Sequence, residues 1–220
     1  MINRDYILRL AEEIGRELAI VLRLRERDQY DDALITLDDL MFRKAGLSSG
    51  FINSLSEEML VRMLSPLGKL NVEACLWIAS LLKAEGEIYD TKGESNTSYY
   101  RYTKALYLFI EAFQQERFPE GSTFSLDIKE LINRLAAYEL PATLQIQLFH
   151  YYEHIGLYAQ AEDVLFDQLE TTQSSQILIE QGYGFYERLL KKSDFDLRAG
   201  NLSREEVQEG LAQLRNMDGK

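Results

Sequence analysis

Tyr30-x-x-Ala33-x-x-x-Leu37 is a phrase that this chain repeats as Tyr102-x-x-Ala105-x-x-x-Phe109 and as Tyr158-x-x-Ala161-x-x-x-Leu165. Each copy follows an apolar helical stretch and a polar break, so each opens the second helix of a pair. The small alanine lets a neighbouring helix approach closely, while the tyrosine and the larger apolar residue fill the space on either side. The repeated phrase therefore predicts helical hairpins that pack against one another.

The composition favours an all-α protein. The chain has 220 residues, of which 46% are apolar and only three are proline, and these values are typical of a folded chain with a sizeable core. Good helix formers recur throughout, and runs of β-branched residues are nearly absent. We therefore expect a single domain that covers residues 1–220 and contains about nine helices.

Apolar periodicity and capping signals place these helices along the chain. We expect the first helix to start near residue 6, and we expect residues 46–50 to form a loop. Asn71 is expected to cap a long helix, and Ser203 with Glu206 has the pattern of a capping box for the last one. The other expected helices cover residues 30–43, 56–65, 98–116, 126–138, 141–155 and 175–191, together with one that starts at residue 158.

The third hairpin, residues 148–165, resembles a tetratricopeptide repeat. Gly156, Tyr158, Ala161 and Leu165 fall on the positions that this repeat prescribes, although Phe149 stands where the repeat usually has glycine and no proline closes the unit. The alanines of the three phrases lie 72 and 56 residues apart, whereas a strict array would show multiples near about 34. We therefore expect a tetratricopeptide-like stack of hairpins that extra helices interrupt, rather than a uniform solenoid.

Residues 22–34, and residues 82–89 with 102–106, resemble a second group, an uncharacterised bacterial family of helical proteins of about this size. This resemblance covers the first half of the chain best and implies a bacterial, Gram-positive source. The family has no assigned activity, so the resemblance supports the fold and implies no mechanism.

The charge of the chain narrows the classes of partner. Thirty-six acidic and 24 basic residues give a net charge of −12, which disfavours binding to nucleic acid or to an anionic membrane.

The single cysteine, Cys75, lies in an apolar stretch, which indicates a buried structural thiol. No signal-peptide or membrane-spanning pattern is found, so we expect a cytoplasmic protein.

His150-Tyr151-Tyr152-Glu153-His154 is the pattern most suggestive of chemistry. It matches H-x-x-E-H, the inverted zinc-peptidase motif, with two imidazoles on one helix face and a glutamate as the possible general base. Peptidases with this motif are much larger and use a distant glutamate as third ligand. A metal-dependent hydrolase, regulatory metal binding and a purely structural role for these residues all stay open at this point, and the structural role is the one that we favour.

In tetratricopeptide hairpins the first helix lines the concave surface. That resemblance implies that Thr143, Ile146, His150 and His154 face a partner. We therefore expect a protein-interaction or scaffold module that lacks catalytic activity, cofactor and metal, binds a protein or peptide, and forms a homodimer in one version of the hypothesis. The alternatives are the hydrolase and a peptide-sensing regulatory domain.

Overall fold

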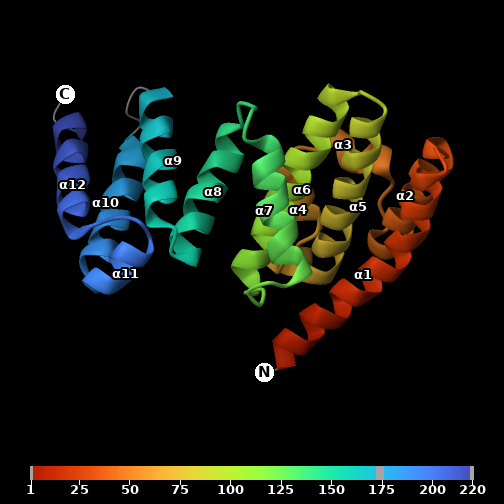
Figure 1. Cartoon of the computed structure of the whole chain (residues 1–220), viewed down its shortest axis with the longest axis horizontal. Helices are drawn as coiled ribbons and strands as arrows, with labels where there is room; N and C mark the ends of the chain where they lie inside the picture. Colours follow the sequence, from red (N-terminus) through yellow and green to blue (C-terminus); the bar gives the residue numbers. More distant parts are fainter. Residues whose placement is uncertain (1, 172–175, 219–220) are drawn as a thin grey trace. The chain divides into compact units, whose positions relative to one another are not determined.

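The computed structural model describes residues 2–171 and 176–218, and every regular element in these ranges is helical (Figure 1). The all-α prediction is therefore confirmed. Twelve α-helices and one short 3₁₀ turn, η1 (Pro66–Gly68), occur in the described residues, so the expectation of about nine helices is too low. The α-helices are α1 (Ile2–Glu26), α2 (Tyr30–Ala45), α3 (Ser49–Ser54), α4 (Glu57–Met63), α5 (Val72–Thr91), α6 (Ser95–Gln115), α7 (Thr123–Leu135), α8 (Ala142–Ile155), α9 (Tyr158–Thr171), α10 (Gln176–Leu190), α11 (Asp194–Ala199) and α12 (Arg204–Asp218).

These helices form two compact units, Met1–Glu139 and Leu140–Lys220. The expectation that residues 1–220 form one domain depends on how the two units combine. It stays a prediction. In the first unit the hairpin of α5 and α6 is central. Helices α1 and α2 pack against α5, and α4 and α7 pack against α6.

The first half of helix α5 is the core of the first unit because its sequence is apolar on nearly every side. Residues 74–82 are all buried, and the Trp77 side chain is fully inaccessible to solvent. A helix with apolar residues all round is stable in water only when other helices surround it. The sequence of α5 therefore requires the neighbours that α1, α2 and α6 supply.

The second unit has its own core. Helices α8 and α9 form a hairpin, and α10 packs against both α9 and α12. The turn between α8 and α9 is made by Gly156, whose φ of 80° is a left-handed conformation that glycine adopts without strain. Aromatic residues dominate the centre of this core, where the rings of Phe149 and Phe185 lie 5.3 Å apart, edge to face.

The repeated phrase opens α2 and α9 as predicted, whereas the copy that begins at Tyr102 lies inside α6, which starts at Ser95. Its alanine and its larger apolar residue are buried in all three copies, as expected for helix–helix contacts. The tyrosines differ. Tyr102 and Tyr158 are buried, whereas Tyr30 is half-buried and donates a hydrogen bond of 2.7 Å to Asp28 in the turn before α2.

The capping signals are confirmed. The Asn71 side chain accepts a hydrogen bond from the Ala74 amide, and the side chains of Ser203 and Glu206 each accept one from the backbone amide of the other residue. Two short helices do not agree with the expected pattern. Helix α3 begins inside the stretch expected to be a loop, and α11 was not expected at all. Both are only six residues long, too short to show amphipathic periodicity, and each starts at a serine N-cap.

Buried polar side chains hold α3 in place. The Lys104 ammonium, on the otherwise apolar face of α6, donates to the carbonyl oxygens of Ile52 and Leu55 at 3.1 and 2.6 Å. Glu85 of α5 accepts from the Ser49 hydroxyl at 2.5 Å and from Arg101 Nε at 2.8 Å. These bonds compensate charges that would otherwise be costly to bury.

Candidate functional site

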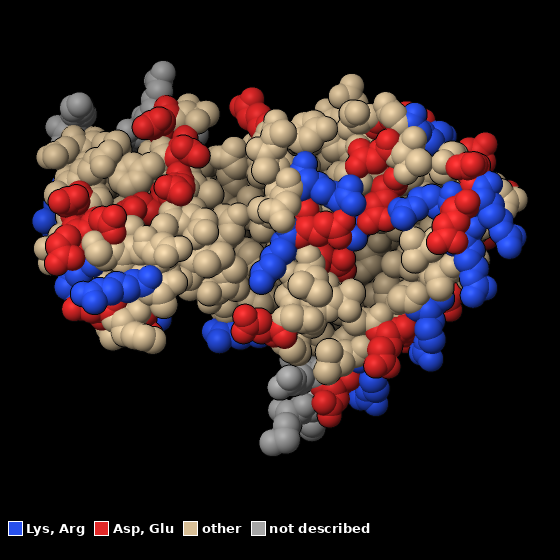
Figure 2. All heavy atoms as spheres, in the orientation of Figure 1, with Lys and Arg blue, Asp and Glu red and all other residues tan. Residues whose placement is uncertain are grey.

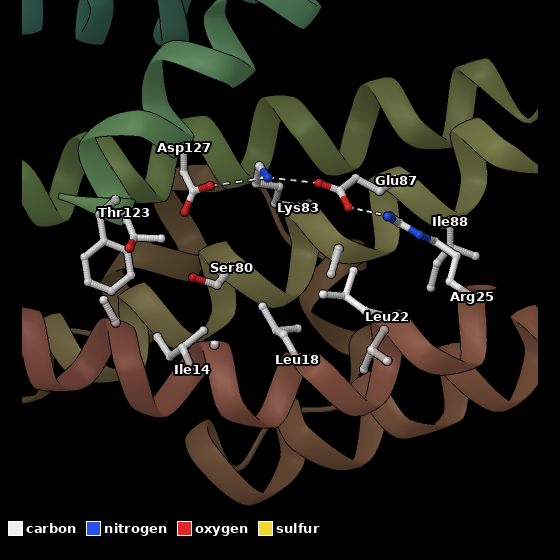
Figure 3. A pocket seen from close by; sticks show the side chains of 15 residues that line it. Ile14, Leu18, Leu22, Arg25, Ser80, Lys83, Glu87, Ile88, Thr123 and Asp127 are labelled. Atoms are coloured by element: carbon white, nitrogen blue, oxygen red, sulfur yellow. Dashed lines mark hydrogen bonds and ion pairs between the residues drawn. The ribbon is translucent and has the colours of Figure 1, made fainter. Parts of the chain in front are cut away.

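A pocket of about 210 Å³ lies in the first unit, between α1, α5 and the start of α7 (Figure 3). Helix α1 contributes an apolar wall that includes Ile14, Leu18 and Leu22, whose side chains point towards α5 in Figure 3. These residues recur at every fourth position, which places them on one helix face. The sequence of α1 therefore supplies more apolar surface than its neighbours cover.

Gly15 opens the pocket on the α1 side. It lines the cavity, and a Cβ added to it would meet no atom within 4 Å. An absent side chain at this position leaves space beside Ile14 and Leu18 that a larger residue would fill. Gly15 is thus a position of the pocket wall where a larger side chain can be introduced.

Charged side chains form one edge of the pocket. The Lys83 ammonium lies 2.9 Å from a Glu87 oxygen, 3.3 Å from an Asp127 oxygen and 2.9 Å from a Glu130 oxygen. Arg25 reaches the other oxygen of Glu87 at 2.5 Å. The row of ion pairs from Asp127 through Lys83 and Glu87 to Arg25 links all three helices that line the cavity (Figure 3).

The ion pairs keep Lys83 charged. Burial lowers the pKa of Lys83, but the Glu87 and Asp127 carboxylates raise it more, so that the pKa lies above its ordinary value. Burial also raises the pKa of Asp127, and Lys83 opposes this change only in part. At Glu130, burial raises the pKa, but hydrogen bonds from Lys83 and Arg134 outweigh it and lower the pKa. Lys83 is therefore poised for ion pairing rather than for nucleophilic attack.

Ser80 places a polar atom in the inner wall of the pocket. Ser80 is only 5% exposed, and its hydroxyl has no hydrogen-bond partner in the structure. Figure 3 shows this side chain on α5, between the Lys83 edge and the wall formed by α1. Buried hydroxyls are nearly always satisfied in folded proteins, so the Ser80 hydroxyl has unused hydrogen-bonding capacity at this wall.

A second, more polar hollow of about 620 Å³ adjoins the pocket and shares Arg25 and Glu87 with it. Five carboxylates line it against the two guanidinium groups of Arg25 and Arg134. Figure 2 shows acidic and basic side chains interleaved across the surface of this unit. The carboxylates that line the hollow are Glu26, Asp28, Glu87, Asp90 and Glu130.

The residues singled out by sequence lie in the second unit. Thr143 and His154 are exposed, and Ile146 packs against the core of that unit. The ring of His150 lies 5.0 Å from that of Phe149, and burial lowers the pKa of this histidine. Whether these four positions face a partner is not tested by their placement, and their role stays a prediction.

The glutamate of the H-x-x-E-H motif is already paired. Arg188 Nε and Nη2 donate to the two oxygens of Glu153 at 2.6 and 2.9 Å, a bidentate arrangement that fixes the carboxylate. Within residues 2–171 and 176–218, no three His, Cys, Asp or Glu side chains are grouped so that they could hold a metal ion. In the described residues, the motif is thus built into an ion pair between α8 and α10.

The α1–α5–α7 pocket was not predicted from the sequence. Two features of the sequence lie at it: Gly15 beside the apolar stripe of α1, and the i to i+4 pair Lys83 and Glu87 in α5. Neither feature shows which side chains of α7 lie beside Lys83, because that contact forms only when the helices pack together.

The chain belongs to a family of unknown function, DUF6483, whose family model matches residues 1–219. This agrees with the resemblance to a helical family without an assigned activity. Comparisons with curated proteins and with solved structures gave no match. Among the described residues, no helix combines the length and the apolar character needed to cross a membrane.

Proposed function

We propose that this member of a family of unknown function is a protein-interaction module without covalent chemistry, and that its α1–α5–α7 pocket accepts an apolar side chain of the partner. One observation carries the proposal: the pocket is open and mainly apolar, and its wall holds the unpartnered hydroxyl of Ser80. A preformed concave site with few polar groups is the usual form of a binding site.

The size of the pocket favours a side chain over a cofactor. At about 210 Å³, it lies below the range of roughly 300–1,000 Å³ that is typical of small-molecule sites. One bulky side chain, or two small ones, fits such a volume. In protein interfaces, single anchors of this kind provide much of the binding energy.

The ionisable groups around the pocket support a non-covalent role. Lys83 is held as an ammonium by its carboxylate partners, and Glu87 is bridged by Lys83 and Arg25. Cys75 is fully buried, and burial raises the pKa of its thiol. A nucleophile needs an accessible group with a lowered pKa or a neighbouring base, and these residues have the opposite properties.

The net charge of −12 and the tetratricopeptide resemblance add to the proposal. Both favour a protein or peptide partner over nucleic acid or a membrane surface, and we place the protein in the cytoplasm. The surface predicted around Thr143, Ile146, His150 and His154 would be a second contact site on the same module.

The test is selection from a displayed library of random peptides, with wild type and Gly15→Leu as targets. Leucine at this position fills the pocket, and Gly50→Leu is the matched control, because a Cβ on Gly50 also meets no atom and that residue does not line the pocket. We expect peptides that bind wild type and Gly50→Leu but not Gly15→Leu. A selection that yields no peptide sensitive to Gly15→Leu would contradict the proposal.

A further inference from the structure

Building on the proposed interaction function, we infer that the partner segment is basic and amphipathic. An apolar side chain of that segment enters the α1–α5–α7 pocket, and its Lys or Arg side chains enter the adjoining acidic hollow. The inference depends on three observations: the continuity of the two cavities, the charge of the hollow and the unpartnered hydroxyl of Ser80.

The two cavities form one continuous surface. Arg25 and Glu87 line both of them, so a ligand that fills the pocket extends directly into the hollow. Both cavities lie within the first compact unit. One short peptide segment can therefore carry both an apolar anchor and a charge into this surface.

The hollow selects for positive charge. Its five carboxylates face its two guanidinium groups and the Lys83 ammonium, which pairs with Glu87 and Glu130, so two negative charges are left uncompensated. Arg25 already pairs with Glu87, and Arg134 pairs with Glu130 and Asp90. The two cations are thus committed to carboxylates of the hollow itself, and an incoming anion would have to displace one of these pairs.

Glu26 and Asp28 are the carboxylates best placed to receive a cation. Both are exposed at the end of α1, and Glu26 makes no ion pair within the described part of the chain. Asp28 accepts one hydrogen bond, from the Tyr30 hydroxyl at 2.7 Å. An ammonium or guanidinium group can therefore bind here without breaking an existing ion pair.

Ser80 indicates, independently of charge, that the pocket receives a ligand. Its hydroxyl is buried and unpartnered, although a serine in a helix can bond to a carbonyl of the preceding turn. A second copy of this chain is a poor occupant by comparison, because with a net charge of −12 it would bring further negative charge to the hollow.

The experiment uses three fluorescein-labelled synthetic peptides of about 15 residues, long enough to form a helix on binding. The first carries Leu and Tyr on one face and Lys on the other. In the second, Glu replaces every Lys, and in the third, Ser replaces every apolar residue. Binding to the full-length protein is followed by fluorescence anisotropy at about 50 mM and about 300 mM NaCl, because salt screens ion pairs at exposed sites.

We expect the first peptide to bind at least about tenfold more tightly than the other two, and less tightly at the higher salt concentration. Gly15→Leu should weaken its binding about tenfold or more, and Glu26→Lys about fivefold. Gly50→Leu and Asp39→Lys are the controls, since neither residue lines either cavity, and both variants should bind as wild type does. Thermal unfolding verifies that all four variants are folded.

The outcomes separate this inference from the proposed function. If acidic or uncharged peptides bind as tightly and remain sensitive to Gly15→Leu, the interaction function stands and the basic partner is wrong. Binding of the basic peptide that ignores Gly15→Leu but vanishes with salt reveals non-specific attraction and overturns the inference. A wild-type dimer that Gly15→Leu dissociates identifies a second copy as the occupant and also overturns it. If no peptide of any charge binds in a way that Gly15→Leu abolishes, both proposals fail.

Discussion

Gly86 of α5 lies directly against the ring of Tyr102 of α6, and no Cβ fits between them. The same arrangement occurs twice in the second unit, where Gly200 faces Tyr158 and Gly210 faces Tyr186. In each pair the glycine has no side chain, so a tyrosine from another helix reaches its backbone. Gly86 and Gly210 lie inside helices, and Gly200 is the residue that caps the end of α11. Two of the three repeated phrases thus depend on a glycine that is distant in sequence.

Gly86→Ala should destabilise the first unit by about 1–3 kcal/mol, because the added methyl group overlaps the Tyr102 ring in a tightly packed core. Gly15→Ala is the matched control. It adds the same methyl group to an exposed helical site with open space, and it should stabilise by about 0.5–1 kcal/mol. Urea unfolding followed by the fluorescence of the single tryptophan, Trp77 of α5, reports on this unit. Equal shifts for the two variants would show that the Gly86 contact is not tight.

Lys104→Met should cost about 2–3 kcal/mol of unfolding free energy. The Lys104 ammonium bonds the carbonyl oxygens of Ile52, Asn53 and Leu55 at the end of α3, and methionine removes these bonds while keeping most of the volume. Lys129→Met, at an exposed position of α7, is the control and should change stability by less than about 0.5 kcal/mol.

Hydrogen exchange gives a second, local test of Lys104→Met. Amides of α3 should lose protection before those of α5, because the lysine holds only the short helix. Uniform loss of protection across both helices would mean that Lys104 stabilises the whole unit rather than α3.

The sequence was sufficient for the features that depend on local signals. The phrase predicted buried Ala33, Ala105 and Ala161, and the capping box at Ser203 formed as expected. The phrase did not predict that Tyr30 would be less buried than Tyr102, because the Tyr102 ring packs against a glycine of another helix, Gly86. Local pattern identifies which face of a helix is apolar, but not what covers that face.

The pocket shows the same limit. The apolar stripe of α1 was recognised from its periodicity, yet the part that stays open is decided by where α5 and α7 lie. The i to i+4 spacing of Lys83 and Glu87 is visible in the sequence, whereas Asp127 and Glu130 join them from a helix about 40 residues further on. Long-range electrostatic clusters of this kind have no signature in a single sequence.

Glu85 and Arg101 should show strong coupling in a double-mutant cycle. Glu85 is 2% exposed and accepts from Arg101 Nε at 2.8 Å, so removing Arg101 leaves a buried carboxylate that keeps only its hydrogen bonds from Ser49 and Asn53. We expect Arg101→Met to destabilise by about 3–5 kcal/mol and Glu85→Met by less, because Arg101 is only partly buried, and we expect the double variant to lose much less than their sum. Denaturant unfolding monitored by Trp77 measures all four corners of the cycle. Additive losses would contradict a direct buried ion pair.

The stability of the second unit should depend on pH through His150. Burial lowers the pKa of His150, and the nearby Arg188 lowers it further, while Glu153 opposes both only in part. The folded state therefore binds a proton at this imidazole less readily than the unfolded chain, whose histidine pKa is about 6.5. It follows that the contribution of His150 to stability is fully present above about pH 6.5 and is lost as the pH falls through that value towards the lower pKa of the folded state.

His150→Gln removes the titrating group, so wild type should lose stability relative to this variant when the pH is lowered from about 7.5 to about 5.5. Urea unfolding followed by circular dichroism measures the difference at each pH, with His154→Gln, an exposed position on the same helix, as the comparison. A difference between wild type and His150→Gln that does not change with pH would show that burial does not impede protonation of this histidine.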